Sequence, residues 1–170
     1  MSKYENVFME KAFKQAELAY AKQEVPVGCV FVYRGNVIGR GHNLVNVTKN
    51  PTRHAEMVAF DEVREYCNLE GLDVASIVGE LELFVTLEPC IMCASAMIQL
   101  GIKEITYAAS NERFGGMTSC SSIDNYGRRA PNFKFNPNVD EERSIEMLRK
   151  FYDRENVAAP EEKRKLKKTK

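Results

Sequence analysis

Two short motifs constrain this chain more than any other feature, because each lies at the start of a predicted helix. The first is His54-Ala55-Glu56 and the second is Pro89-Cys90-Ile91-Met92-Cys93. Cysteines three residues apart lie on one helix face or across one turn, so both sulfurs can reach one ion. His54 supplies a third ligand through an imidazole nitrogen. A shared ion requires the two helix starts to lie together, and a helix N-terminus favours thiolate over thiol.

The hydrophobic pattern predicts alternating helices and strands. Apolar residues at helical spacing predict helices over 4–22, 54–67, 91–100 and 140–152, and Thr52 is expected to cap the second of these. Dense apolar runs predict strands over 27–33, 37–40, 81–86 and 103–108, with one more short strand before the last helix. Residues 42–52 and 110–132 are expected to be loops, and 71–79 a connector. This order predicts a three-layer α/β domain with a mixed sheet.

Three protein ligands leave the fourth tetrahedral position of zinc open for water, which is the pattern of catalytic sites. Glu56 lies two residues beyond His54, near the expected metal without being needed as a ligand. Zinc lowers the pKa of a bound water to about 7, and a nearby carboxylate can take that proton and return it to a substrate. Attack on an amidine-type carbon, with proton delivery to the departing amine, is hydrolytic deamination.

Other interpretations of the cysteine pair stay open at this point. A lone Cys-x-x-Cys also occurs in structural zinc sites and in redox pairs. A structural site needs a fourth protein ligand, and His42 is the only other histidine of the chain. We expect His42 to be an exposed loop residue instead.

Length and composition suit one domain inside the cell. The 170 residues are 44% hydrophobic, enough for a full core without disulfides. The order of apolar and polar residues indicates no signal peptide, and no apolar run reaches the roughly 18 residues that a membrane helix needs. We therefore expect a soluble protein of the nucleus or cytoplasm with reduced thiols. Cys29, Cys67 and Cys120 are expected to be free.

A net charge of zero hides an uneven distribution. Residues 157–170 carry six basic and two acidic side chains, a charge of +4 that leaves −4 on residues 1–156. We expect 1–156 to form the catalytic domain and 157–170 a disordered tail. The tail fits attraction to an RNA backbone and equally fits a solubilising or nuclear-targeting segment. Its candidate RNA contacts are Lys163, Arg164, Lys165, Lys167 and Lys168.

The motif pair H-x-E and P-C-x-x-C resembles the signature of zinc nucleobase deaminases, over about residues 5–152. This resemblance implies a cytidine-deaminase-like α/β/α fold with a mixed central sheet of about five strands. Five segments resemble the transfer-RNA adenosine deaminases: Glu24-Val25-Pro26-Val27-Gly28, Asn43, 52–56, 87–94 and Asn111-Glu112-Arg113-Phe114-Gly115-Gly116.

Within that family the chain is most similar to the catalytic subunits of the eukaryotic enzymes, which convert wobble adenosine 34 to inosine. Those subunits pair with a related, catalytically defective subunit that typically lacks the glutamate of H-x-E. The resemblance implies that this chain, with Glu56, is the active member. It also implies Zn²⁺ as cofactor, tRNA as substrate and the defective subunit as partner.

The resemblance further implies roles in a base pocket. Asn43 matches a position whose side chain hydrogen-bonds the flipped purine, and an amide offers both a donor and an acceptor. Val27 matches an apolar wall of the pocket. Asn111 falls where bacterial relatives carry an aspartate near the ribose, and Arg113 and Phe114 are further candidate contacts. From the residues alone, an ordinary turn residue is the favoured interpretation of Asn43, and a core residue is the favoured interpretation of Val27.

Two other functions remain as alternatives. A deaminase of free cytosine or nucleotides needs neither a basic tail nor a partner. A non-catalytic RNA-binding scaffold with structural zinc is the second, although Glu56 and the open ligand position argue against it. A base in an anticodon loop is the favoured substrate, since single-stranded loops let a base be splayed out at little cost.

Overall fold

The computed structural model describes residues 3–122, 125 and 134–154. Within these residues five strands form one sheet in the order β2-β1-β3-β4-β5. The strands are β1 (Gly28–Tyr33), β2 (Asn36–His42), β3 (Glu82–Val85), β4 (Glu104–Tyr107) and β5 (Lys134–Asn136). β1 is antiparallel to β2 and β3, whereas β4 is parallel to β3 and β5. The predicted mixed sheet is confirmed.

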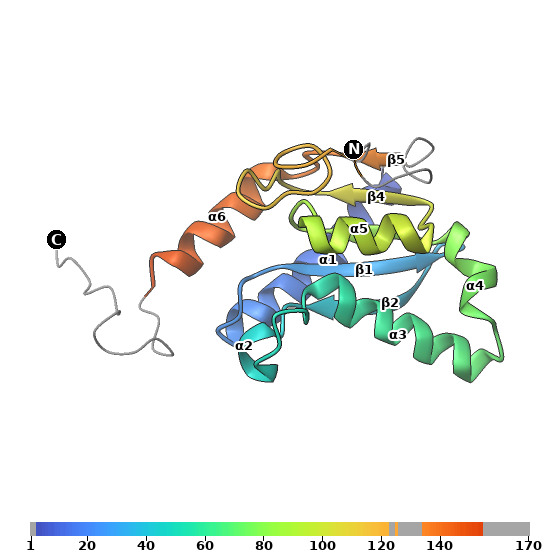
Figure 1. The fold of residues 1–170 in the computed structure, drawn as a ribbon. Helices are drawn as coiled ribbons and strands as arrows, with labels where there is room; N and C mark the ends of the chain where they lie inside the picture. The colour runs from blue at the N-terminus through green and yellow to red at the C-terminus, as the bar shows by residue number, and fades with distance from the viewer. Residues whose placement is uncertain (1–2, 123–124, 126–133, 155–170) are drawn as a thin grey trace, which may run out of the picture.

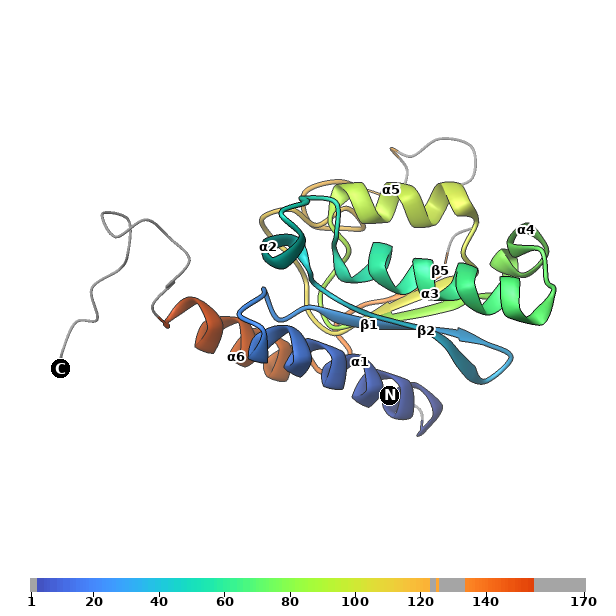
Figure 2. The same cartoon turned by 90° about the horizontal axis from the view of Figure 1, so that it is seen from below.

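Helices cover both faces of this sheet (Figure 1). They are α1 (Lys3–Ala21), α2 (Val45–Thr48), α3 (Ala55–Glu70), α4 (Val74–Ile77), α5 (Ile91–Leu100) and α6 (Glu141–Tyr152), with the 3-10 turn η1 (Val78–Glu80). Figure 2 shows α3 and α5 on one side of the sheet and α1 and α6 on the other. The predicted three-layer α/β/α architecture follows.

Side chains of the inner strand β1 alternate between two hydrophobic clusters, because successive strand residues point to opposite faces. Val30 and Val32 join the cluster under α1, which also contains Phe13. Cys29 and Phe31 join the larger cluster under α3 and α5. Burial on both faces explains why this strand is a continuous apolar run in the sequence.

The structure corrects several predicted boundaries. Residues 42–52 hold the end of β2 and the short helix α2, and residues 71–79 hold α4 and the start of η1. The predicted cap at Thr52 is wrong, because the chain stays extended at His54 and His54 itself is the N-cap of α3. The Thr52 hydroxyl instead donates to Asn50 Oδ1 at 2.7 Å.

Some predictions concern residues outside the described part of the chain. The domain boundary at 156 and the basic tail of 157–170 are among them. Cys29, Cys67 and Cys120 are free thiols, as predicted. None of the described helices has the length and apolar character needed to cross a membrane.

Close packing of α3 against β2 depends on a glycine. A Cβ at Gly41 would lie 2.1 Å from the Ala55 carbonyl oxygen and 2.5 Å from Ala59 N. These distances are far shorter than van der Waals contact, so only glycine lets the first turn of α3 approach the strand. Because His54 and Glu56 belong to that turn, Gly41 also determines where they lie.

We predict that Gly41→Ala lowers the free energy of unfolding by about 3 kcal/mol, because overpacking must push α3 away from β2. Denaturant unfolding measures the loss. Gly79→Ala is the matched control, since a Cβ there would meet only the Gly101 carbonyl oxygen, at 4.0 Å. Equal stability of the two variants would contradict this account of the packing.

Candidate active site

Four segments that carry candidate site residues meet at one edge of the sheet. The parallel strands β3 and β4 end at this edge, where ligands of α/β sheets generally bind. β1 begins at the same edge and β2 ends there, since Gly28 pairs with His42 and Cys29 pairs with Val85. Residues just before β1 and just after β2, β3 and β4 therefore lie side by side.

The starts of α3 and α5 bring the two motifs together. His54 is the N-cap of α3, Cys90 is the N-cap of α5, and Cys93 lies in the first turn of α5. His54 Nδ1 is 3.4 Å from Cys90 Sγ and 3.6 Å from Cys93 Sγ. All three ligand atoms lie within 4.8 Å of one another. Two sulfurs and one imidazole nitrogen at this spacing fit a tetrahedral zinc ion with bonds of about 2.0–2.3 Å.

His42 does not join this group as a fourth ligand. It lies half-buried at the end of β2, with Nε2 3.0 Å from Lys22 Nζ and Nδ1 3.3 Å from Gln15 Oε1. The prediction of an exposed loop residue is wrong because β2 extends to this position. Across the described residues no fourth protein ligand gathers, so a closed structural site loses its support.

The electrostatics of the site favour a thiolate at Cys90. Hydrogen bonding from Cys93 and from His54 lowers the pKa of Cys90 to about 4, against the opposing effect of burial. The interaction with Cys90, together with burial, raises the pKa of Cys93. The hydrogen bond with Cys90 also raises the pKa of His54. The two sulfurs thus compete for negative charge, and a divalent cation between them lets both ionise.

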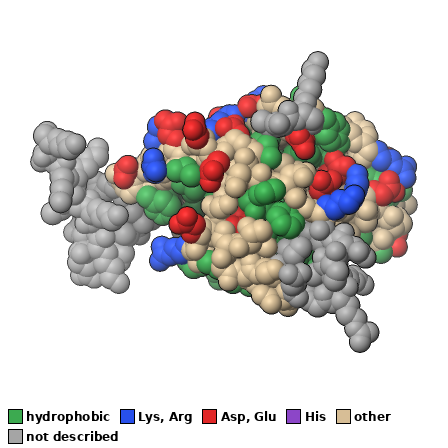
Figure 3. Space-filling view, turned by 90° about the horizontal axis from the view of Figure 1, so that it is seen from above, with side chains coloured by type: hydrophobic (Ala, Val, Ile, Leu, Met, Phe, Trp, Pro, Cys, Tyr) green, Lys and Arg blue, Asp and Glu red, His purple; other side chains and the backbone are tan. Residues whose placement is uncertain are grey.

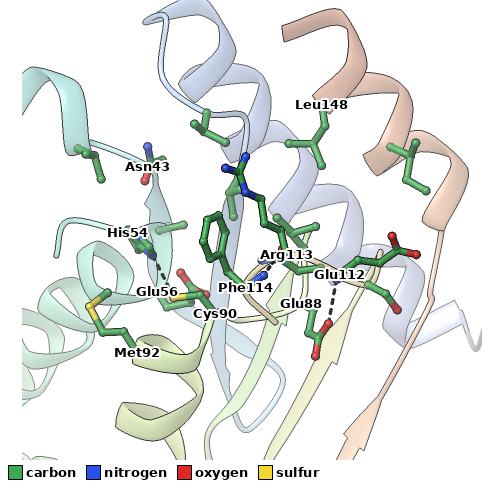
Figure 4. A pocket seen from close by; sticks show the side chains of 18 of the residues that line it. Asn43, His54, Glu56, Glu88, Cys90, Met92, Glu112, Arg113, Phe114 and Leu148 are labelled. Carbon is green, nitrogen blue, oxygen red and sulfur yellow. Dashed lines mark hydrogen bonds between the residues drawn. The ribbon is translucent and has the colours of Figure 1, made fainter. Parts of the chain in front are cut away.

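Glu56 is almost completely buried, with 3% of its surface exposed, in the first turn of α3. Burial raises its pKa, and the negative charge of Cys90 raises the pKa further, while His54 partly opposes both effects. Figure 4 shows its side chain beside His54 and Cys90. A carboxyl with a raised pKa next to such a donor set is suited to taking up and releasing a proton.

A cavity of about 1030 Å³ opens in front of these groups. His54, Glu56 and Cys90 line it, whereas Cys93 is fully buried and lies outside the lining. The remaining described candidates also line it: Val27, Asn43, Asn111, Arg113 and Phe114. The structure therefore brings every described candidate residue to one place.

The loop after β4 forms one wall of this cavity, and the buried Glu88 holds the loop. Its carboxylate accepts a hydrogen bond from the Ser119 hydroxyl and from four backbone N–H groups, those of Asn111, Met117, Thr118 and Ser119. Burial raises the pKa of Glu88, but these hydrogen bonds outweigh burial and lower the pKa below its usual value. The carboxylate thus fixes a segment that has little regular structure of its own.

The same loop is joined to the start of α5. Cys90 and Gly115 form an isolated β-bridge, and Ile91 N donates to the Phe114 carbonyl at 3.0 Å. A Cβ at Gly115 would lie 2.2 Å from Glu88 Oε2, so the loop can approach the carboxylate only at a glycine. Backbone hydrogen bonds therefore join the loop directly to the cysteine motif.

Asn111 has a local partner. Its Oδ1 accepts the N–H of Phe114 at 3.1 Å, which holds the turn, and its predicted sugar contact stays a prediction. Phe114 is 56% exposed and lines the cavity. The Arg113 guanidinium lies 5.1 Å from the centre of its ring. An exposed aromatic face beside a cation is suited to stacking a base.

The sequence pattern does not reveal every residue that builds the site. It assigns no role to Glu24 or Glu88, although an acidic residue inside an apolar stretch beside a strand is a signal for a buried, satisfied carboxylate. The α6 wall of the cavity is also unexpected. Ile145, Leu148, Arg149 and Tyr152 line the cavity from this helix, and Figure 4 shows Leu148 across the cavity from His54. The spacing of apolar residues predicts helix α6, but it does not indicate which part of the protein the apolar side of this helix faces.

The chain is similar to known proteins along most of its length. Residues 2–109 match the family model described as the cytidine and deoxycytidylate deaminase zinc-binding region. The tRNA-specific adenosine deaminase 2 of Xenopus tropicalis is 44% identical over 158 residues, 92% of this chain and 93% of that protein. The tRNA-specific adenosine deaminase subunit tad2 of Schizosaccharomyces pombe is 40% identical over 153 residues, 90% of this chain and 38% of that protein.

A solved structure confirms the predicted cytidine-deaminase-like fold. It comes from biochemical and structural studies of A-to-I editing by tRNA:A34 deaminases at the wobble position of transfer RNA. The two chains superpose with a TM-score of 0.69 at 31% identity. The match covers 84% of this chain and 99% of the other.

We predict that the purified protein holds about one zinc ion per chain, and that His54→Ala and Cys90→Ser each remove most of it, because two remaining ligands bind zinc weakly. Elemental analysis of the protein after dialysis measures the zinc. Cys120→Ser is the matched control, since this exposed thiol is not part of the donor group. Full zinc content in Cys90→Ser would rule out the assigned ligand.

Proposed function

Because the chain belongs to the tRNA-specific adenosine deaminases, a family built on the cytidine and deoxycytidylate deaminase zinc-binding region, we propose that it converts adenosine 34 of tRNA anticodons to inosine by hydrolysis. One observation carries the proposal. A group of three metal-binding side chains, next to a buried carboxyl, opens onto a cavity instead of being closed by a fourth protein ligand.

His54, Cys90 and Cys93 would hold the zinc through one imidazole nitrogen and two sulfurs. When bound there, the ion supplies Lewis acidity that lowers the pKa of a water molecule to about 7. The positive ends of two helix dipoles point at the same place, because α3 and α5 both begin there. These dipoles would stabilise the thiolate ligands.

Glu56 would carry protons between water and substrate. Its raised pKa makes it a stronger base than an exposed glutamate, so it can accept the proton of the attacking water. The same proton would then go to the amine at C6 of adenine. Water adds to C6, the C6–N bond breaks, ammonia leaves, and the 6-oxo base of inosine remains.

The cavity would receive the target base together with part of its strand. Val27 would contribute the apolar wall, Asn43 the polar contact to the base, and Phe114 a stacking surface at the mouth. A volume of about 1030 Å³ is at the upper end for small-molecule sites, which span roughly 300–1,000 Å³. The cavity extends along α6 and is larger than a single base needs, which favours a nucleotide within a polymer over a free base.

A partner subunit would supply part of the RNA surface. Residues 1–156 carry a net charge of −4, whereas the substrate is a polyanion. Figure 3 shows acidic and basic side chains interspersed on the face that carries α6 and β5, with no continuous basic surface among the described residues there. We propose a related subunit without the motif glutamate as partner; the S. pombe relative is itself named a subunit. The tail with Lys163, Arg164 and Lys165 would add further attraction.

We predict that Glu56→Ala binds tRNA as the unchanged protein does, yet forms inosine at position 34 about 10²–10⁴-fold more slowly, because the proton carrier is lost. Gel-shift binding and inosine mapping measure the two effects, with and without the partner subunit. Glu65→Ala is the matched control on the exposed side of α3. Appreciable turnover by Glu56→Ala would contradict the assigned role.

The same assay separates the proposal from a free-base deaminase. The unchanged protein should release ammonia from tRNA and not from a panel of free nucleosides and nucleotides. Ammonia release from free cytidine or deoxycytidylate, without conversion of adenosine 34, would contradict the proposed tRNA substrate and identify a free nucleoside or nucleotide as the substrate.

A further inference from the structure

Glu24 is a fully buried acidic residue that the proposed chemistry does not use. It lies between α1 and β1, and three hydrogen-bond donors converge on its carboxylate. Asn43 Nδ2 donates to Oε2 at 3.1 Å, Asn46 N donates to Oε2 at 3.1 Å, and Val47 N donates to Oε1 at 2.7 Å. Both carboxylate oxygens are thus engaged, and every one of these donors belongs to the segment 43–47 beside the cavity.

The carboxylate decides which way the Asn43 amide faces. An ionised carboxylate only accepts hydrogen bonds, so Asn43 must direct its nitrogen, and not its oxygen, at Glu24. The opposite orientation would place the amide oxygen against a carboxylate oxygen. In Figure 4 the amide oxygen of Asn43 lies on the side toward His54. Asn43 is itself 6% exposed, so its side chain has little freedom to turn.

We propose that Glu24 is a positioning residue that acts through Asn43: it binds one amide N–H and so presents the amide oxygen and the second N–H to the substrate base. This proposal rests on the proposed function. A primary amide has one N–H on the same side as its oxygen and one on the opposite side. With the opposite N–H bound to Glu24, the edge left for the base carries one acceptor and one donor side by side.

That edge matches adenine and not guanine. The N6/N7 edge of adenine offers a donor beside an acceptor, and an asparagine amide pairs with it through two hydrogen bonds. The O6/N7 edge of guanine offers two acceptors, so one of them would face the Asn43 oxygen unpaired. Glu24 would therefore contribute to the choice of base without touching the base.

Glu24 also secures the main chain that carries Asn43. Asn43 N donates to the Val27 carbonyl at 3.1 Å, which joins the segment before β1 to the segment after β2. The bonds from Asn46 and Val47 fix the first turn of α2 to the same carboxylate. Val27, Asn43 and Val45 all line the cavity, so one buried charge holds this whole wall.

A double-mutant cycle tests whether Glu24 acts through Asn43. We expect Glu24→Gln to lower kcat/KM for an anticodon stem-loop with adenosine 34 about tenfold, the effect of one lost hydrogen bond. In the Asn43→Ala background the same change should have a clearly smaller effect, because the amide that Glu24 orients is absent and only the bonds to Asn46 N and Val47 N remain to be weakened. Equal fold-losses in both backgrounds, or no loss from Glu24→Gln, would overturn the proposal.

The control is Glu62→Gln, because the Glu62 carboxylate accepts a backbone hydrogen bond from Arg40 N at 2.9 Å and does not line the cavity. It should keep full kcat/KM. Zinc content should be unchanged in Glu24→Gln, since Glu24 does not belong to the donor group. A loss of zinc that accounts for the whole loss of activity would count against positioning.

Thermal unfolding gives a second test that needs no activity. Asn43→Asp places two carboxylates together and should lower Tm, whereas Glu24→Gln combined with Asn43→Asp restores a donor–acceptor pair and should raise Tm above that of Asn43→Asp. A combined variant whose Tm is no higher than that of Asn43→Asp would overturn the pairing, even if Glu24→Gln alone is too unstable to assay. If the unchanged protein forms no inosine, the proposed function fails, while this Tm comparison still judges the role of Glu24.

Discussion

The meeting of two helix starts at one sheet edge is the constraint on which the rest of the structure depends. α3 reaches this point because Gly41 lets it lie against β2, and α5 reaches it because β3 ends there. Hydrogen bonds from Cys93 and His54 stabilise the thiolate of Cys90. The positive partial charge of a helix N-terminus favours the same form. Two neighbouring sulfurs cannot both be ionised at low cost unless a cation lies between them, so the same geometry that places the ligands also creates the demand for zinc.

Two buried glutamates hold the walls around this centre. Glu24 accepts hydrogen bonds from the segment 43–47, and Glu88 accepts them from the loop 111–119. Burying a carboxylate is costly unless donors replace the lost water, and in both cases backbone N–H groups do so. These irregular segments have no strand pairing or helical hydrogen bonds to hold them. Charge-assisted hydrogen bonds to the two carboxylates attach them to the sheet edge instead. A pocket that must discriminate between bases needs walls of this rigidity.

Much of this arrangement can be predicted from the sequence, because the spacing of apolar residues and the helix-capping signals depend only on residues that are close together in the chain. The helix over 91–100 and the strand β1 have the expected places, and His54, Glu56 and Cys90 come together as their motifs predict. Only the cap of α3 is mispredicted: the Thr52 hydroxyl donates to Asn50 Oδ1, and His54 is the N-cap. Glu24, Glu88 and the α6 wall could not be predicted, because their roles depend on contacts between segments far apart in the chain. The choice of adenosine in tRNA likewise comes from similarity to relatives and not from the zinc motif.

The coordination of the metal tests the central claim most directly. Zinc X-ray absorption on the purified protein measures the ligand types and the bond lengths in one experiment. We predict two sulfurs at about 2.3 Å, one imidazole nitrogen at about 2.0–2.1 Å and one exchangeable light atom. A third sulfur or a second imidazole in the shell would mean a closed, structural site and would contradict the account.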